Sequence, residues 1–92
     1  MLVKLIEIRK DFAGGTASLN EIYINSSHII SITEDLSAKQ NLVNEVQRLG
    51  LVENVRFSKI IISEGNSVRT ITAVGMPSEI NGKIRKRQIL RG

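Results

Sequence analysis

Two runs of β-branched residues flank a short polar segment near the middle of the chain. Residues 55–63 and 68–74 are rich in Val, Ile and Thr, and Glu64-Gly65-Asn66-Ser67 between them is typical of a tight turn. This pattern predicts a β-hairpin. If it closes about Gly65-Asn66, one face pairs Ile62 with Arg69, Ile60 with Ile71 and Ser58 with Ala73, and the other pairs Phe57 with Val74 and Ile61 with Thr70. Because neither face is polar, we expect a covering layer on both sides.

Three further strands are expected before this hairpin. Residues 1–9 are a short apolar run, and residues 19–25 alternate Ile22 and Ile24 with polar neighbours. Residues 28–33 predict a third strand with Ile30 and Ile32 on one face and Ile29 on the other. Residues 10–18 form the expected loop between the first two strands, and Asn25-Ser26-Ser27 forms the turn before the third.

Helical spacing occurs twice. Within residues 38–49 an apolar stripe consists of Leu42, Val43, Val46 and Leu49, and Gly50 ends the helix. Ser37-Ala38-Lys39-Gln40 fits a capping box, with Asp35 as an alternative cap. Pro77 predicts the start of a short C-terminal helix with Ile80 and Ile84 on one side.

These elements predict an α+β protein. We expect an antiparallel five-stranded curved sheet or small partly open β-barrel, with one helix between strands three and four and a short C-terminal helix. Residues 1–82 would form a single α+β domain and residues 83–92 a basic C-terminal tail. The strands carry more apolar surface than one amphipathic helix covers, which predicts a homo-oligomer.

Charge changes the picture at the C-terminus. The chain has a formal net charge of +4, but residues 1–82 have eight Lys or Arg against nine Asp or Glu. The excess is the tail cations Lys83, Arg85, Lys86, Arg87 and Arg91, which could neutralise phosphates of a nucleic acid. Aromatic residues for base stacking are few, and Ile84, Ile89 and Leu90 lie among the cations. This mixture favours docking on an acidic protein patch, or a solvated end, over nucleic acid.

Side chains for catalysis or metal binding are scarce. The chain has no Cys, and His28 is its one histidine. A catalytic triad would need Glu21 or Glu34 beside it and Ser26 or Ser27 as nucleophile, and their adjacency in a turn and strand does not give triad geometry. We therefore expect no enzyme, no metal and no cofactor.

A small anionic ligand has one candidate site in the sequence. Gly14, Gly15 and Thr16, next to Lys10, could form a backbone nest for a phosphate or nucleotide. The segment lacks the Lys-Ser/Thr ending of a P-loop, so a flexible hairpin loop is the favoured interpretation.

No apolar run approaches the roughly twenty residues of a membrane span, and the first residues lack the apolar core of a signal peptide. We expect a cytoplasmic protein without membrane contact.

The order of the motifs resembles a known family. A strand, an Asn-led turn and a strand over residues 19–34 are followed by Lys59-Ile60-Ile61-Ile62, Gly65-Asn66, Ile71-Thr72-Ala73-Val74 and Pro77-Ser78-Glu79-Ile80. This order resembles the small β-rich FlbD-like flagellar proteins and small uncharacterised phage and prophage proteins. The chain departs from them in the helix of residues 38–49 and in its longer basic tail. The resemblance implies a fold and no catalytic residues.

The expected function is a non-enzymatic binding module, phage-encoded in one reading, that self-associates and binds a protein partner. Two alternatives stay open. One is nucleic-acid binding through the tail, and the other is binding of a small anion at the Gly14-Gly15 loop or at a subunit interface.

Overall fold

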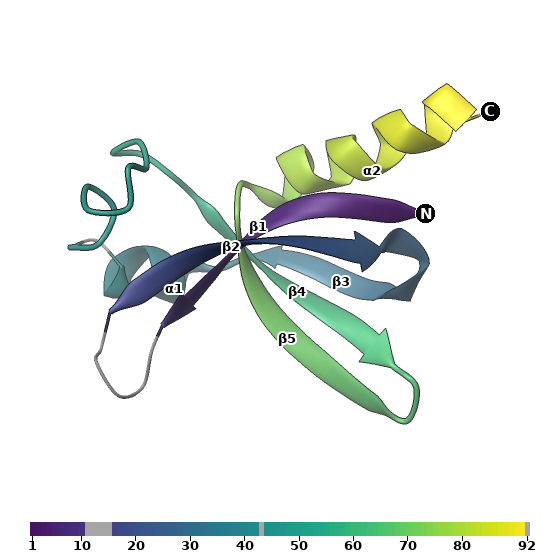
Figure 1. The fold of residues 1–92 in the computed structure, drawn as a ribbon, viewed down its shortest axis with the longest axis horizontal. Coiled ribbons are helices and arrows are strands. Elements are labelled where there is room, and N and C mark those ends of the chain that lie inside the picture. Colours follow the sequence, from purple (N-terminus) through teal and green to yellow (C-terminus); the bar gives the residue numbers. More distant parts are fainter. Residues whose placement is uncertain (11–15, 43, 92) are drawn as a thin grey trace.

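Five antiparallel strands and two α-helices make up the computed structural model, which describes residues 1–10, 16–42 and 44–91 (Figure 1). For Lys10 and residues 86–91 it describes the backbone alone. The elements in chain order are β1 (Leu2–Lys10), β2 (Ala17–Asn25), the 3₁₀-helix η1 (Ser26–His28), β3 (Ile29–Glu34), α1 (Leu36–Asn41), β4 (Phe57–Glu64), β5 (Ser67–Val74) and α2 (Pro77–Arg91). The strand order is β2-β1-β5-β4-β3. The sheet is therefore open, which confirms the predicted five-stranded antiparallel sheet.

The central hairpin has the predicted register. All five predicted pairs are present in the β4–β5 ladder, from Phe57 with Val74 to Ile62 with Arg69. Gly65 has a φ of +73°, whereas Asn66 keeps a negative φ. A positive φ at the first central residue is the type II′ turn, whose twist suits a two-residue hairpin and which favours glycine there.

One face of this hairpin is covered as predicted, whereas the other is covered only at the end that carries Phe57 and Val74 and leaves Val68 63% exposed. A first core cluster combines Ile60, Ile62, Ile71 and Ala73 of the hairpin with Val3, Leu5, Ile24 and Ile80. A second cluster on the opposite face contains Phe57, Ile8, Ala17, Ala38, Leu42 and Val55. Phe57 and Ile60 are both 0% exposed. Adjacent positions of a strand point to opposite faces, so β4 supplies a buried anchor to each cluster.

The sheet bends into two layers. Among the described residues β1 and β5 pair at Glu7 and Ala73, and from this point the β1–β2 ribbon and the β4–β5 hairpin diverge (Figure 1). The first core cluster fills the space between these layers. α2 runs beside β1 and contributes Ile80, which is 1% exposed, with Ile84 partly buried next to it.

The predicted faces of β3 are wrong because the strand contains a β-bulge. Ile29 pairs with Ile62 and Ser31 with Ile61, so Ile30 is an extra residue without a partner on β4. The bulge shifts the alternation by one position. Ile29 and Ile32 therefore both pack on the first core cluster, and Ile30 is 57% exposed.

The predicted bounds of the first helix are also wrong. α1 spans Leu36–Asn41, and the residues described after it form separate turns up to Gly50. Asn and Val are modest helix formers, and Asn41, Asn44 and Val46 lie in this part of the sequence. The alternative cap is the correct one, since Asp35 accepts the N–H of Ala38 while the Ser37 hydroxyl donates to Asp35.

Other strand boundaries differ from expectation. Lys10, Ala17 and Ser18, all assigned to the first loop, lie in β1 and β2, and His28, assigned to the third strand, lies in η1. α2 extends to Arg91, so the backbone of residues 83–91 is helical and the predicted limit between domain and tail falls inside this helix.

The apolar excess that predicted a homo-oligomer is smaller than expected. Val3, Leu5 and Ile8 of β1 are at most 6% exposed within one copy of the chain. Among the described residues, large apolar side chains that stay exposed include Leu2, Tyr23 and Val68. An argument for association must therefore come from a particular site.

Candidate binding site

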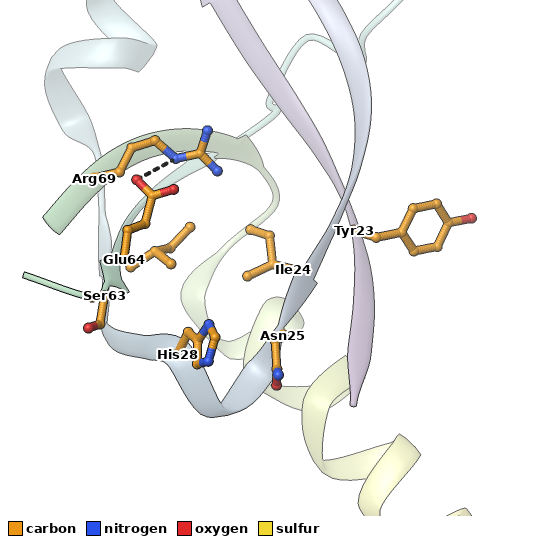
Figure 2. Close-up of a pocket in the computed structure, with 9 residues that line it drawn as sticks. Tyr23, Ile24, Asn25, His28, Ser63, Glu64 and Arg69 are labelled. Atoms are coloured by element: carbon orange, nitrogen blue, oxygen red, sulfur yellow. Dashed lines mark ion pairs between the residues drawn. The ribbon is translucent and has the colours of Figure 1, made fainter. Parts of the chain in front are cut away.

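A pocket opens between the end of β2, η1 and the turn of the β4–β5 hairpin (Figure 2). Its volume is about 380 Å³. The residues that line it are Tyr23, Ile24, Asn25, His28, Ile62, Ser63, Glu64, Gly65 and Arg69. It thus joins segments that are far apart in the sequence.

The floor of the pocket is apolar and its rim is polar. Ile24 and Ile62 are 6% and 3% exposed, and both belong to the first core cluster. On the rim, Arg69 Nε lies 3.5 Å from Glu64 Oε1, with both side chains 48% exposed. Exposed ion pairs of this kind contribute little free energy, so both groups can turn to a ligand. Figure 2 shows Ile24 pointing into the pocket and Tyr23 pointing away from it.

Asn25 shapes the wall where β2 ends. Its Oδ1 accepts hydrogen bonds from the N–H and hydroxyl of Ser27, at 3.1 and 2.8 Å, and lies 3.4 Å from the amino group of Met1. These contacts form an Asx-type turn that starts η1. The chain therefore leaves the β1–β2 ribbon at a fixed point beside the pocket.

The free edge of β2 runs up to this pocket. β2 pairs with β1 and, within the described part of the chain, has no strand on its other side. Ser26 N–H donates to Met1 O, which makes these opposed residues a hydrogen-bonded pair of the ladder. Such pairs alternate along an antiparallel ladder, so the register places Val3 with Ile24 and Leu5 with Ile22 in the same class.

The residues between these pairs direct their backbone groups away from β1. They are the odd-numbered residues of β2, namely Ala17, Leu19, Glu21, Tyr23 and Asn25. One contact agrees with this assignment independently, because Arg48 Nη2 donates to the carbonyl of Ala17 from outside the ribbon. Arg48 thereby covers the first outward carbonyl, and Leu19, Glu21 and Tyr23 follow it along the free edge.

Few charges protect this edge. Glu21 is the one charged residue in nine positions of β2, and its carboxylate lies 4.0 Å from Lys4 Nζ and 3.5 Å from the Tyr23 hydroxyl. Exposed edges usually carry lysines, prolines or bulges that discourage a further strand. β2 has a continuous register with β1 and contains neither Lys nor Pro.

His28 lies in η1 and is exposed at the pocket. Three of the four side chains considered for a triad make other contacts. Glu34 Oε2 pairs with Arg56, Glu21 with Lys4, and the Ser27 hydroxyl donates to Asn25. In the described part of the chain, no group of three or more His, Asp or Glu side chains is arranged to hold a metal ion.

The two sites proposed from sequence are placed only in part. Lys83 and Arg85 are exposed on α2, and the side chains of Lys86, Arg87 and Arg91 are outside the description. Of the anion candidate, Gly14 and Gly15 lie outside the described residues, the backbone of Lys10 ends β1, and Thr16 is exposed before β2. Of those whose side chains are described, Thr16, Lys83 and Arg85 do not line the pocket.

Sequence reasoning missed the pocket and the free edge. Neither is visible before the strand order is known, since β2 could equally be an inner strand. The pattern that the sequence offers is misleading, because a strand with a single charge resembles a protected inner strand more than an edge.

Comparison of the chain with protein-family models, with curated proteins and with solved structures found no match. The resemblance to FlbD-like and phage proteins thus stays a prediction. None of the described helices has both the length and the apolar character that crossing a bilayer requires.

Proposed function

We propose that the chain is a non-enzymatic interaction module that binds protein by adding an extended segment to the free edge of β2. Leu19, Glu21 and Tyr23 direct their N–H and C=O groups outward along this edge. An incoming antiparallel strand would accept and donate hydrogen bonds at each of them. This row of outward backbone groups is the observation that carries the proposal.

The neighbouring pocket supplies selectivity. In strand addition the backbone gives affinity, and pockets for alternate side chains give specificity. Ile24 and Ile62 offer an apolar floor beside the edge, and Arg69 and Glu64 offer charges at its rim. The site suits a segment with an apolar side chain toward the pocket and a polar neighbour.

The test removes one outward hydrogen-bond donor. Tyr23→Pro eliminates the outward N–H and leaves the β1–β2 ladder intact, because Tyr23 lies between the hydrogen-bonded pairs. Tyr23→Val is the matched control, since it also lacks the phenol but keeps the N–H. Peptides selected from a random display library on the unmodified protein should bind Tyr23→Pro about tenfold more weakly or worse.

The same peptides should keep most of their affinity for Tyr23→Val. Circular dichroism melts establish that both variants are folded. Selected peptides that bind all three proteins equally, together with self-association that Tyr23→Pro leaves unchanged, would contradict the proposal.

A further inference from the structure

We infer that the segment added at this edge is β2 of a second copy, antiparallel to the first and related to it by a two-fold axis at Ile22. The inference rests on the proposed function, because it names the partner for the same edge. Three observations support it: which residues of β2 direct their backbone groups outward, which side chains they carry, and the contact of Arg48 with the carbonyl of Ala17.

The alternation of outward and inward backbone groups along β2 limits how two copies can pair. Odd-numbered residues of β2 face outward, so hydrogen-bonded pairs between copies must join odd with odd. In a symmetric antiparallel pair this places the axis at a residue of the strand. Four positions, from Asn20 to Tyr23, keep most of β2 in contact.

Three of these positions meet an obstacle. An axis at Asn20 pairs Tyr23 with Ala17, whose carbonyl already accepts from Arg48. An axis at Glu21 sets two carboxylates directly opposite each other, which destabilises a strand pair. An axis at Tyr23 pairs Leu19 with Ser27, which lies beyond the strand in η1.

The axis at Ile22 keeps these obstacles outside the shared segment: residues 19–25 of the two copies pair with each other, and Ala17, with its capped carbonyl, falls opposite Ser27 beyond that segment. Glu21 of each copy then lies opposite Tyr23 of the other, and Leu19 lies opposite Asn25. Tyr23 Oη already lies 3.5 Å from Glu21 Oε1 within one strand, so phenol and carboxylate share a face and suit a cross-strand pair. At the axis the two Ile22 side chains meet in a non-hydrogen-bonded pair, where opposed side chains are closest. Ile22 is partly buried against the first core cluster, and its counterpart would cover it further.

Cysteine cross-linking tests the register, because the chain has no Cys of its own. Non-hydrogen-bonded pairs have Cα atoms about 4.5 Å apart, within the range a disulfide spans. Ile22→Cys should therefore form a covalent dimer under mild oxidation at micromolar concentration. Asn20→Cys, on the same face two positions away, should not, and exposed Val68→Cys controls for random collision. A dimer through Glu21→Cys, or none through Ile22→Cys, would overturn the inference.

Charge exchange tests the same register without a covalent bond. Tyr23→Glu places carboxylates opposite Glu21 of the other copy and should convert the dimer into a 10.2 kDa monomer in light scattering. Tyr23→Lys should keep the dimer, and the double variant Glu21→Lys with Tyr23→Glu should restore it. A double variant as monomeric as Tyr23→Glu would contradict the pairing.

Failure of this inference is distinguishable from failure of the proposed function. If the unmodified protein is a monomer but its selected peptides still require the Tyr23 N–H, the second copy is wrong and the strand-adding module stands. If Tyr23→Pro affects neither self-association nor peptide binding, both are wrong.

Discussion

At the scale of single residues, Asp35 shows how a buried charge is held. The residue is 7% exposed, and its carboxylate accepts hydrogen bonds from Ala38 N–H at 3.0 Å and from Ser37 Oγ at 2.8 Å. Burial raises the pKa of the Asp35 carboxyl, but the Ala38 and Ser37 hydrogen bonds, the charge of Lys59 and the Thr72 hydroxyl together outweigh it, so the pKa lies below its ordinary value. The carboxylate therefore caps α1 as an anion.

Asp35→Ala should lower the free energy of unfolding by about 1 kcal/mol at neutral pH, as loss of an N-cap does. A carboxyl with a lower pKa in the folded state stabilises fully above its unfolded value of about 3.9 and loses this effect as the pH falls through the folded value. The difference between the unmodified protein and the variant should thus be constant above about pH 5 and shrink below about pH 4. Urea unfolding at several pH values measures it.

Exposed Glu53→Ala is the control for this experiment, and its effect on the free energy of unfolding should be near zero. A difference for Asp35→Ala that grows on acidification would contradict the assigned direction of the pKa shift.

At the scale of the elements, the sequence determined strands and turns better than faces and helix length. The β4–β5 register followed from alternation on both sides of Gly65-Asn66, which is local information. The bulge at Ile30 could not be predicted, because isoleucines at 29, 30 and 32 fit two alternations equally well. The helix of residues 38–49 was overestimated because its apolar spacing is also satisfied by separate turns that bury Leu42 and partly bury Val46.

The bulge makes a prediction that simple alternation does not. Ile30→Ser should change the free energy of unfolding by no more than about 0.5 kcal/mol, because Ile30 is 57% exposed. Ile32→Ser should lower it by more than about 1 kcal/mol, because Ile32 packs on the first core cluster. Chemical denaturation measures the free energy of unfolding of both variants. Equal losses for Ile30→Ser and Ile32→Ser would place the two side chains on the same face.

α2 gives the element-scale test of the nucleic-acid alternative. A variant with Gln at 83, 85, 86, 87 and 91 removes five positive charges and keeps Ile84 against the core. Its retention on heparin should fall, because that affinity depends on the number of cations. Its mass in light scattering and its affinity for selected peptides should not change. If the variant lost self-association or peptide affinity, the binding surface would lie on α2 and not on β2.

At the scale of the whole molecule, the candidate site depends on topology that no local pattern encodes. Ile24 and Ile62 could be recognised as core residues from alternation, but they meet at one pocket only because the β1–β2 ribbon packs on the β4–β5 hairpin. The same arrangement of strands leaves β2 at an edge beside the pocket. Sequence therefore predicts the composition of the core, whereas the edge and the pocket follow from how the two layers close on each other.

Association through β2 should also make folding depend on concentration, which gives the last prediction. A dimer that dissociates on unfolding gains stability by mass action, so its melting temperature rises with protein concentration. For a chain of 92 residues we expect an increase on the order of 5 °C over a hundredfold range. Tyr23→Glu should show no such rise, and at the lowest concentration its melting temperature should approach that of the unmodified protein. Circular dichroism in cells of different path length measures both, and a rise of equal size in Tyr23→Glu would place the association elsewhere on the molecule.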